Sequence, residues 1–344
     1  MRVVVVGATG NVGTSLIAAL ESDPKVTTIV GVARRQPRWE GGPKTTFRAA
    51  DIATDDLQDI FSGADAVIHL AWLFQPMRRP LLTWRNNVLG GIRVFNAVAE
   101  AGVPKLVYAS SVGAYSPGGG PVDESWPTHS WPAAAYGREK AYLERVLDTF
   151  ELEHPSTRVV RMRPGFIFKR EAASEQRRLF GGPFTPRAGG VPLIPDIPGL
   201  RLQILHTDDA ARAFHLAATQ PVKGAFNIAA EPVLDMPTLA ELLDARLIPV
   251  PISLARAAVA AAWRLRLIPA TPGMLEIALH IPLMDTRRAR EELDWTPRHT
   301  APEALLAFLS GLREGAGMDT EPLKPDRGVR GRIEEVATGV GERP

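Results

Sequence analysis

The sequence has 344 residues, of which 45% are hydrophobic and 23% charged, and its formal net charge is +2. This length suggests two domains, and so small a net charge argues against a nucleic-acid partner. The chain has no cysteine and no uninterrupted apolar run of membrane-spanning length, which excludes disulfides and indicates a cytoplasmic protein without a membrane span.

The chain begins with a predicted buried strand, because residues 3–6 are four consecutive valines. Gly7, Gly10 and Gly13 follow in the pattern G-x-x-G-x-x-G and lead into an apolar helix pattern. Glycines at this spacing allow a sharp turn, a close approach of a pyrophosphate to the backbone, and a helix N-terminus aimed at its charge. Packing alone can require such glycines, but the flanking strand and helix favour a cofactor. The predicted cofactor contacts are Gly7, Thr9, Gly10, Asn11, Val12 and Gly13.

The second predicted strand ends in Ala33, Arg34 and Arg35. Dinucleotide sites usually place an acid at this point to bind the adenosine ribose, whereas a guanidinium can bind a 2′-phosphate. Arg34 and Arg35 therefore predict NADP, with NAD as the less favoured cofactor. The alternative is that both arginines are simply solvated.

Further strand patterns alternate with helix patterns, which predicts an α/β fold with a doubly wound parallel sheet, the Rossmann fold. The strands lie at 66–70, 105–111, 157–165 and 224–230. We expect a dinucleotide-binding domain from residues 1–165 plus about 202–230. A smaller, mostly helical C-terminal substrate domain is expected from 166–201 plus 231–315. Residues 316–344 lack apolar periodicity and are predicted to be a flexible tail.

A predicted helix over 133–150 carries Tyr136 and Lys140 on one inward stripe, one turn apart. An ammonium beside a phenol favours the ionised phenol, so the pair suits an acid–base group and its tuner. The alternative is a packing tyrosine and a lysine whose stem reaches to water.

The sequence resembles the extended short-chain dehydrogenase/reductases, which include sugar-nucleotide epimerases and dehydratases, over roughly residues 1–315. The resemblance rests on nine motifs in order. They are GATGNVG, the Asp51–Ile52 pair, HLA at 69–71, NVLG from Asn87, YASS ending at Ser111, YGREK from Tyr136, RPG at 163–165, HTDD at 206–209 and ELDWTPR at 292–298.

The resemblance implies a role for each matching residue. Ser111 would hold the substrate oxygen, Tyr136 would donate or accept the proton, and Lys140 would bind the nicotinamide ribose and lower the pKa of Tyr136. Asn87 would support the proton relay or the substrate. The remaining cofactor contacts would be Asp51 and Ile52 near adenine, Leu70 and Ala71 along the dinucleotide, and Pro164 and Gly165 near the nicotinamide amide. HTDD is expected to be structural, and the seven histidines show no H-E-x-x-H spacing, so we predict no metal site.

Departures from the family pattern narrow the chemistry. Val112 and Gly113 stand where dehydratases carry an Asp-Glu pair, which argues against a 4,6-dehydratase. Sugar-nucleotide enzymes carry a diphosphate-binding Arg-Asp pair and a Tyr-Gly pair, and these are replaced here by Leu202 and Gln203 and by Phe168 and Lys169. The residues expected to line the substrate cleft are Trp72, Leu73, Phe74, Phe166 and Ser111, although the aromatic ones could equally be packing residues.

Three functions remain open at this point. The first is an NAD(P)-dependent oxidoreductase that transfers hydride to or from a carbonyl or alcohol of a largely apolar small molecule. The second is a nucleotide-sugar epimerase with tightly bound NAD, and the third is a non-catalytic NADP-binding sensor or scaffold. In the family, helices matching residues 81–101 and 136–152 pair across a two-fold axis, so we expect a homodimer.

Overall fold

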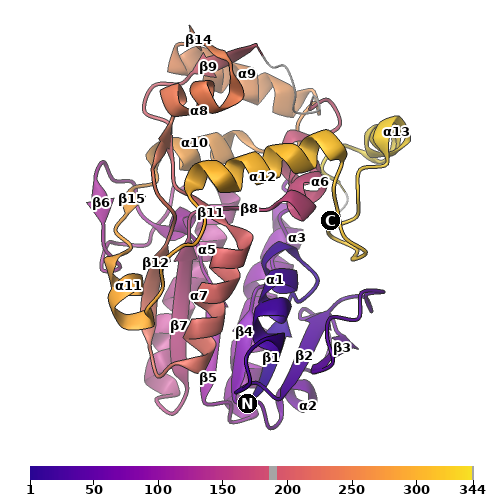
Figure 1. Ribbon diagram of the computed structural model, residues 1–344, viewed down its shortest axis with the longest axis vertical. Helices are drawn as coiled ribbons and strands as arrows, with labels where there is room; N and C mark the ends of the chain where they lie inside the picture. Colours follow the sequence, from indigo (N-terminus) through magenta and orange to yellow (C-terminus); the bar gives the residue numbers. More distant parts are fainter. Residues whose placement is uncertain (186–191, 343–344) are drawn as a thin grey trace.

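The computed structural model describes residues 1–185 and 192–342 (Figure 1). Its centre is a sheet of seven parallel strands in the order β12-β7-β5-β4-β1-β2-β3. The strands are β1 (Arg2–Val6), β2 (Thr28–Ala33), β3 (Thr45–Ala49), β4 (Ala66–His69), β5 (Lys105–Ala109), β7 (Arg158–Pro164) and β12 (Gly224–Ile228). Because the chain starts at β1 and builds the sheet outward on both sides, the fold is doubly wound, which confirms the predicted fold class.

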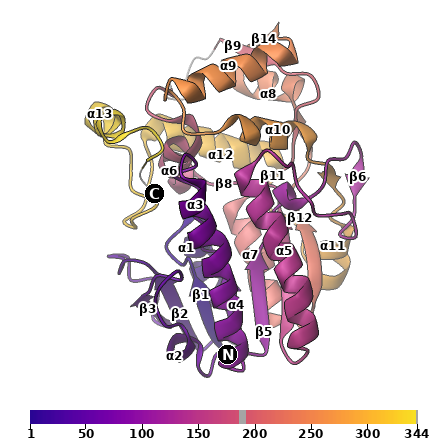
Figure 2. The same cartoon turned by 180° about the vertical axis from the view of Figure 1, so that it is seen from behind.

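Helices cover both faces of the sheet. In Figure 1, α1 (Asn11–Glu21) and α7 (Thr207–Thr219) lie in front of it. Figure 2 shows α4 (Gly90–Glu100) and α5 (Ala135–Glu153) on the opposite face. The four valines of β1 explain how one strand serves both layers, because successive side chains of a strand point to opposite faces. Val3 and Val5 belong to one apolar cluster, and Val4 and Val6 belong to the other.

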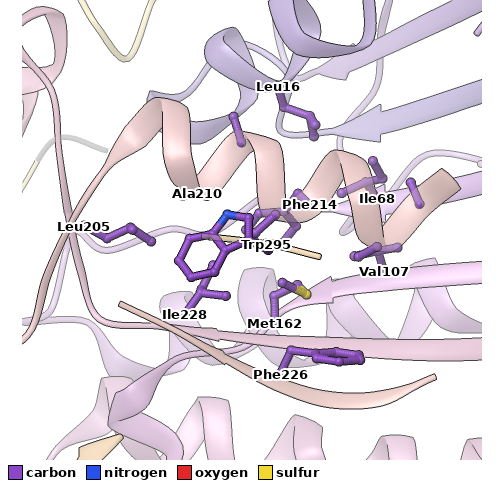
Figure 3. Close-up of a cluster of buried hydrophobic side chains, with 14 of the residues drawn as sticks. Leu16, Ile68, Val107, Met162, Leu205, Ala210, Phe214, Phe226, Ile228 and Trp295 are labelled. Carbon is purple, nitrogen blue, oxygen red and sulfur yellow. The ribbon is translucent and has the colours of Figure 1, made fainter. Parts of the chain in front are cut away.

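The first apolar cluster also contains Trp295, which is fully buried beside Ala210 and Phe214 of α7 (Figure 3). The Trp295 indole Nε1 donates to the Asp209 backbone oxygen at 2.9 Å, and the Asp209 carboxylate accepts from the backbone amides of Arg298 and His299 at 2.8 and 2.9 Å. The HTDD and ELDWTPR motifs therefore join two segments by packing and hydrogen bonds, as the sequence predicts.

Two local elements near the N-terminus differ from the expected pattern. The strand β3 follows no buried or alternating apolar pattern, since it is an edge strand with mostly exposed side chains. The helix α2 is short and spans only Gln58–Phe61. The next helix is continuous through α3 (Pro80–Trp84), η1 (Arg85–Leu89) and α4.

The rest of the chain forms a mostly helical region that lies largely beyond the carboxyl edge of the sheet, whereas α11 (Arg287–Leu293) lies beside β12 (Figure 1). Its helices are η3 (Arg170–Ala172), α6 (Ala173–Gln176), η4 (Arg177–Gly181), α8 (Met236–Leu243), α9 (Ile252–Arg264), α10 (Pro272–His280), α11 (Arg287–Leu293) and α12 (Ala301–Glu314). Short strand pairs are β8 (Phe166–Phe168) with β11 (Ile204–His206), β9 (Leu193–Asp196) with β14 (Arg246–Pro249), β10 (Arg201–Leu202) with β13 (Leu234–Asp235), and β6 (Pro121–Val122) with β15 (Leu283–Met284). The predicted domain boundaries remain a prediction. Among the described residues, no helix combines the length and apolar character that crossing a bilayer requires.

Residues 316–342, which lie in the segment predicted to be a flexible tail, include a helix and buried side chains. This segment contains α13 (Gly328–Thr338), and Leu323 and Val340 on either side of that helix are buried. The segment is held mainly by hydrogen bonds and ion pairs with α6 and η4, such as Arg177 with Glu335 at 2.6 Å. Polar anchoring of this kind leaves no apolar period in the sequence, which is why the pattern suggested disorder.

Candidate active site

The glycine-rich turn between β1 and α1 is packed against the end of β4. Gly7 has φ +89°, and a Cβ there would lie 2.6 Å from the backbone nitrogen of Ala71. A Cβ at Gly13 would lie 2.3 Å from the Gly7 oxygen, whereas one at Gly10 would meet that oxygen at 3.6 Å. Gly10 is the N-cap of α1, and no side chain caps this helix. An uncapped helix N-terminus behind a tight backbone turn fits a pyrophosphate group.

Replacing Gly13 and Gly10 by Ala separates packing from ligand approach. Gly13→Ala is expected to lower the free energy of unfolding by about 2 kcal/mol or more, because its Cβ collides with backbone. Gly10→Ala should leave that free energy within about 0.5 kcal/mol, since φ is −85° and only an ordinary contact forms. Chemical denaturation of both variants measures the two free energies of unfolding. NAD⁺ titration of both variants measures whether the added methyl group weakens binding. Unweakened NAD⁺ binding by Gly10→Ala would contradict the close approach of a ligand to this turn.

The other residues of the turn have structural partners. The Asn11 side chain donates to the Ile167 oxygen at 3.3 Å and accepts from Thr207 Oγ1 at 2.9 Å, while its backbone oxygen accepts from Lys169 Nζ at 2.9 Å. Lys169 also donates to Thr14 Oγ1 and Ser15 Oγ. Val12 packs against the first apolar cluster. Lys169 stands where the resemblance implies a glycine. Its hydrogen bonds stabilise the turn and the start of α1.

The remaining predicted cofactor contacts surround the same edge of the sheet. Arg34 and Arg35 follow β2, and Arg35 pairs with Glu321 at 3.0 Å. Leu70 and Ala71 follow β4, and Ile52 packs with the second apolar cluster. The Asp51 carboxylate accepts from the Ala53 amide at 2.9 Å. Pro164 ends β7, and a Cβ at Gly165 would lie 2.3 Å from the Gln203 oxygen, so this glycine is required by backbone packing.

Tyr136 lies in the first turn of α5, next to Ser111 at the N-cap of η2 (Val112–Ala114). Ser111 Oγ accepts from the Gly113 amide at 2.9 Å. A Cβ on Gly113 would lie 2.9 Å from Cε1 of Tyr136 and 3.3 Å from Ser111 Oγ. Burial raises the pKa of Tyr136 to about 12, and Ser111 acts on this pKa in the opposite direction. The two side chains that the resemblance assigns to proton transfer therefore lie together against Gly113.

Lys140 lies one turn further along α5, and its side chain is buried. Its Nζ donates to the Ala109 oxygen at 2.6 Å and lies 3.5 Å from the centroid of the Trp72 ring. Burial lowers the pKa of Lys140 to about 7, opposed by the charges of Glu139 and Glu144. The resemblance implies a Tyr136 pKa lowered by this ammonium, but the structure has the opposite direction. The physical reason is that burial dominates at the phenol while the ammonium is directed at a carbonyl and an indole ring.

An aromatic wall adjoins Tyr136. Phe74 stacks on the Tyr136 ring at 5.2 Å, Trp72 meets it edge-on at 5.7 Å, and Phe180 of η4 contacts Phe74 at 5.2 Å. Phe166 instead packs against the first apolar cluster, and no ring contact joins it to this wall among the described residues. The structure thus brings Trp72 and Phe74 to the site and packs the half-buried Phe166 against the first apolar cluster. Phe180 was missed because it lies in a Gly/Pro-rich stretch without a motif.

Asn87 is a buried positioning residue. Its amide oxygen accepts from the Leu73 N–H at 2.7 Å, and its amide nitrogen donates to the Leu73 oxygen at 3.0 Å and to Glu139 Oε2 at 2.7 Å. Thr83 Oγ1 donates to the other Glu139 oxygen at 2.7 Å. Asn87 therefore holds the backbone between Trp72 and Phe74 and fixes the carboxylate beside Lys140. Sequence reasoning missed Glu139, although it stands inside the YGREK motif.

The family of the chain follows from comparison with known proteins. Residues 3–229, about two-thirds of the chain, match the profile described as the NAD dependent epimerase/dehydratase family. The chain belongs to the NAD-dependent epimerase/dehydratase family. Family membership confirms the resemblance to extended short-chain dehydrogenase/reductases that the nine motifs carry.

Curated relatives of this epimerase/dehydratase family member match at moderate identity. An uncharacterized protein of Mycobacterium tuberculosis is 28% identical over 325 residues, which cover 92% of this chain and 31% of the relative. The chain thus spans about a third of the length of the first curated relatives. A UDP-glucose 4-epimerase of Lactobacillus helveticus is 28% identical over 156 residues, covering 43% of this chain and 46% of that enzyme.

Solved structures with the same fold include proteins in complex with NAD. MoeE5 in complex with UDP-glucose and NAD aligns with a TM-score of 0.67 at 20% identity, covering 91% of this chain and 99% of that one. UDP-glucuronic acid 4-epimerase from Bacillus cereus in complex with NAD aligns with a TM-score of 0.68 at 16% identity over the same shares. At these identities the similarity establishes the fold alone.

Proposed function

We propose that this member of the epimerase/dehydratase family is an NAD-dependent epimerase that inverts a hydroxyl-bearing carbon of a nucleotide sugar. The observation that carries the proposal is that Ser111 and the Tyr136 ring lie together against Gly113, next to buried Lys140, at the sheet edge where the glycine-rich turn meets Ala71. Family membership and the UDP-glucose 4-epimerase among the relatives support the same reaction class.

The side chains present can carry the proton half of such a reaction. A bound nicotinamide ring would supply reversible hydride transfer at the carbon that carries the hydroxyl. Tyr136 would take the proton of that hydroxyl and return it after the carbon has turned its other face, while Ser111 holds the same oxygen. The tyrosine must lose its proton for this step, so the positive charges of Lys140 and of the oxidised ring would have to offset the burial that raises its pKa.

We propose NAD as the dinucleotide, in place of the NADP predicted from Arg34 and Arg35. Arg35 is engaged by the Glu321 carboxylate at 3.0 Å, which offsets the positive charge on which the NADP prediction rested. NAD is also the cofactor named in the solved structures of MoeE5 and of the Bacillus cereus epimerase. Lys140, the glycine-rich turn and the residues after β4 would hold it.

A second candidate is a dehydrogenase or reductase for a largely apolar small molecule. The aromatic wall of Trp72, Phe74 and Phe180 beside Tyr136 favours it. Gln203, which stands in the family's diphosphate-binding position, uses its amide to pair with the Met284 backbone at 2.6 and 3.0 Å. Arg201, which precedes Leu202 and Gln203, donates to the Gly119 oxygen at 3.1 Å. The homodimer and the cytoplasmic location remain predictions.

Mass spectrometry of the nucleotide that remains bound after purification tests the proposed function. An epimerase is expected to retain close to one NAD per chain and to interconvert UDP-glucose and its C4 epimer without net formation of NADH. A dehydrogenase or reductase would instead consume added NAD(P)H stoichiometrically with a carbonyl substrate. Failure to bind NAD or NADP by titration would overturn both candidates.

A further inference from the structure

Residues 316–326 form a compact loop beside α1, at the carboxyl edge of the sheet (Figure 1). Within it the Met318 amide donates to the Leu323 oxygen at 2.7 Å, and the Asp326 amide donates to the Gly315 oxygen at 3.0 Å. Leu323 has no exposed surface, and a Cβ at Gly317 would lie 2.3 Å from the Leu323 oxygen. The loop therefore has a defined shape of its own.

Two neighbouring elements fix this loop in place. The Arg178 guanidinium of η4 donates to the Pro322 and Lys324 oxygens at 2.9 and 2.8 Å. Ser174 Oγ of α6 accepts from the Asp326 amide at 3.1 Å. These bonds hold the loop to the region that also supplies Phe180 to the aromatic wall.

The loop touches the glycine-rich turn directly. Thr320, which is 2% exposed, donates from Oγ1 to the Thr9 oxygen at 2.9 Å. Thr9 lies between Gly7 and Gly10, so the loop packs directly against the glycine-rich turn. The next residue, Glu321, meets Arg35 just after β2 at 3.0 Å.

The end of the second strand is where dinucleotide folds read the 2′ position of the adenosine ribose. An acid there binds the 2′-hydroxyl and repels a 2′-phosphate, whereas arginine accommodates the phosphate. This chain has arginines at that point, but a carboxylate arrives from 286 residues away. Glu321 also accepts from Lys324 at 2.6 Å, and this hydrogen bond helps to lower its pKa, so the group is ionised at neutral pH.

We propose that the loop 316–326 completes the dinucleotide site and that Glu321 makes this site select NAD over NADP. The inference rests on the proposed function, because it requires a dinucleotide on the glycine-rich turn. Glu321 occupies Arg35 and Lys324, the cations that a 2′-phosphate needs, and its charge repels that phosphate. Removing the Glu321 charge would leave Arg35 and Lys324 free to bind a 2′-phosphate together with Arg34.

The test is the pair of dissociation constants for NAD⁺ and NADP⁺, measured by calorimetry on the full chain. The wild type is expected to bind NAD⁺ more tightly than NADP⁺. Glu321→Gln should strengthen NADP⁺ binding by about tenfold while changing NAD⁺ binding by less than about twofold. Adding Arg35→Gln to that variant should remove the gain, because the guanidinium is the released ligand.

Glu314→Gln is the matched control, since Glu314 is a similarly exposed carboxylate that pairs with Arg170 away from the turn. It should leave both dissociation constants unchanged. A wild type that binds NAD⁺ and a Glu321→Gln variant with the same NAD⁺ to NADP⁺ ratio would overturn this inference alone. A wild type that binds neither dinucleotide would overturn the proposed function as well.

Discussion

Tyr136→Phe is expected to lower turnover by about 10³-fold, within the range that general acid–base groups contribute. The substitution removes only the hydroxyl of a ring that lies beside Ser111 against Gly113. The remaining ring can keep its stacking on Phe74 at 5.2 Å and its edge contact with Trp72 at 5.7 Å. Dinucleotide affinity and thermal stability should therefore change little. Steady-state rates on the substrate that the wild type converts, together with NAD⁺ titration, provide the measurement.

Tyr142→Phe is the control for that experiment. Tyr142 lies on the same helix α5 but is 45% exposed and contacts Trp84 instead of the site. It should retain the wild-type rate. If Tyr136→Phe also retained that rate, Tyr136 would not be the acid–base group and the proposed chemistry would have to be abandoned.

Glu144→Ala is expected to lower the free energy of unfolding by about 3–5 kcal/mol, because it leaves the buried guanidinium of Arg163 without a counter-charge. Glu144 on α5 has no exposed surface and accepts two bonds from Arg163 at 2.9 Å and one from Arg161 at 3.2 Å. Ser110 donates to the same carboxylate at 2.5 Å. Urea denaturation at pH 7 is the measurement, with Glu144→Gln as the milder variant if Glu144→Ala does not fold.

The pH dependence of this stabilisation has a definite sign. Burial raises the pKa of Glu144, but the charge and hydrogen bonds of Arg163, together with Arg161, outweigh burial and lower it from 4.5 to about 2. A group with a lowered folded-state pKa stabilises the fold above its unfolded pKa and loses that contribution as pH falls through the folded value. The stability gap between the wild type and Glu144→Gln should therefore be full above pH 5 and shrink between about pH 4.5 and about pH 2.

Glu153→Gln on the exposed end of α5 is the matched control for Glu144. It removes one carboxylate from the same helix and should shift the free energy of unfolding by less than about 0.5 kcal/mol. A Glu144→Gln variant as stable as this control would mean that the buried ion pairs contribute nothing to folding.

Local sequence patterns were sufficient to predict the central fold. Each of the patterns used lies within a single strand, turn or helix. They are the valine run of β1, the glycine spacing that follows it, and the stripe of Tyr136 and Lys140 on α5. Periodicity reports which side of an element is buried, so these patterns predicted the parallel sheet and the residues at its edge. The edge strand β3 escaped because a largely exposed strand has no apolar pattern to detect.

The roles of several site residues depended on contacts that no local pattern contains. Asn87 was expected near the proton relay, yet its three hydrogen bonds hold Leu73 and Glu139. Phe166 was expected in the cleft but packs against the first apolar cluster. Phe180 contacts Phe74 of the aromatic wall instead. Which aromatic residue reaches the site is decided by how the segment after β7 folds back.

The sequence by itself determined the parallel α/β sheet, the glycine-rich turn after β1 and the Tyr136–Lys140 spacing, because each is set by neighbours within a few residues. Only the tertiary structure decided that residues 316–342 contain the helix α13 and that Glu321 pairs with Arg35. Ion pairs between segments nearly 300 residues apart leave no periodic trace in either segment. The net charge near the predicted ribose position is consequently a property of the folded chain. Arg34 and Arg35 on their own predict NADP.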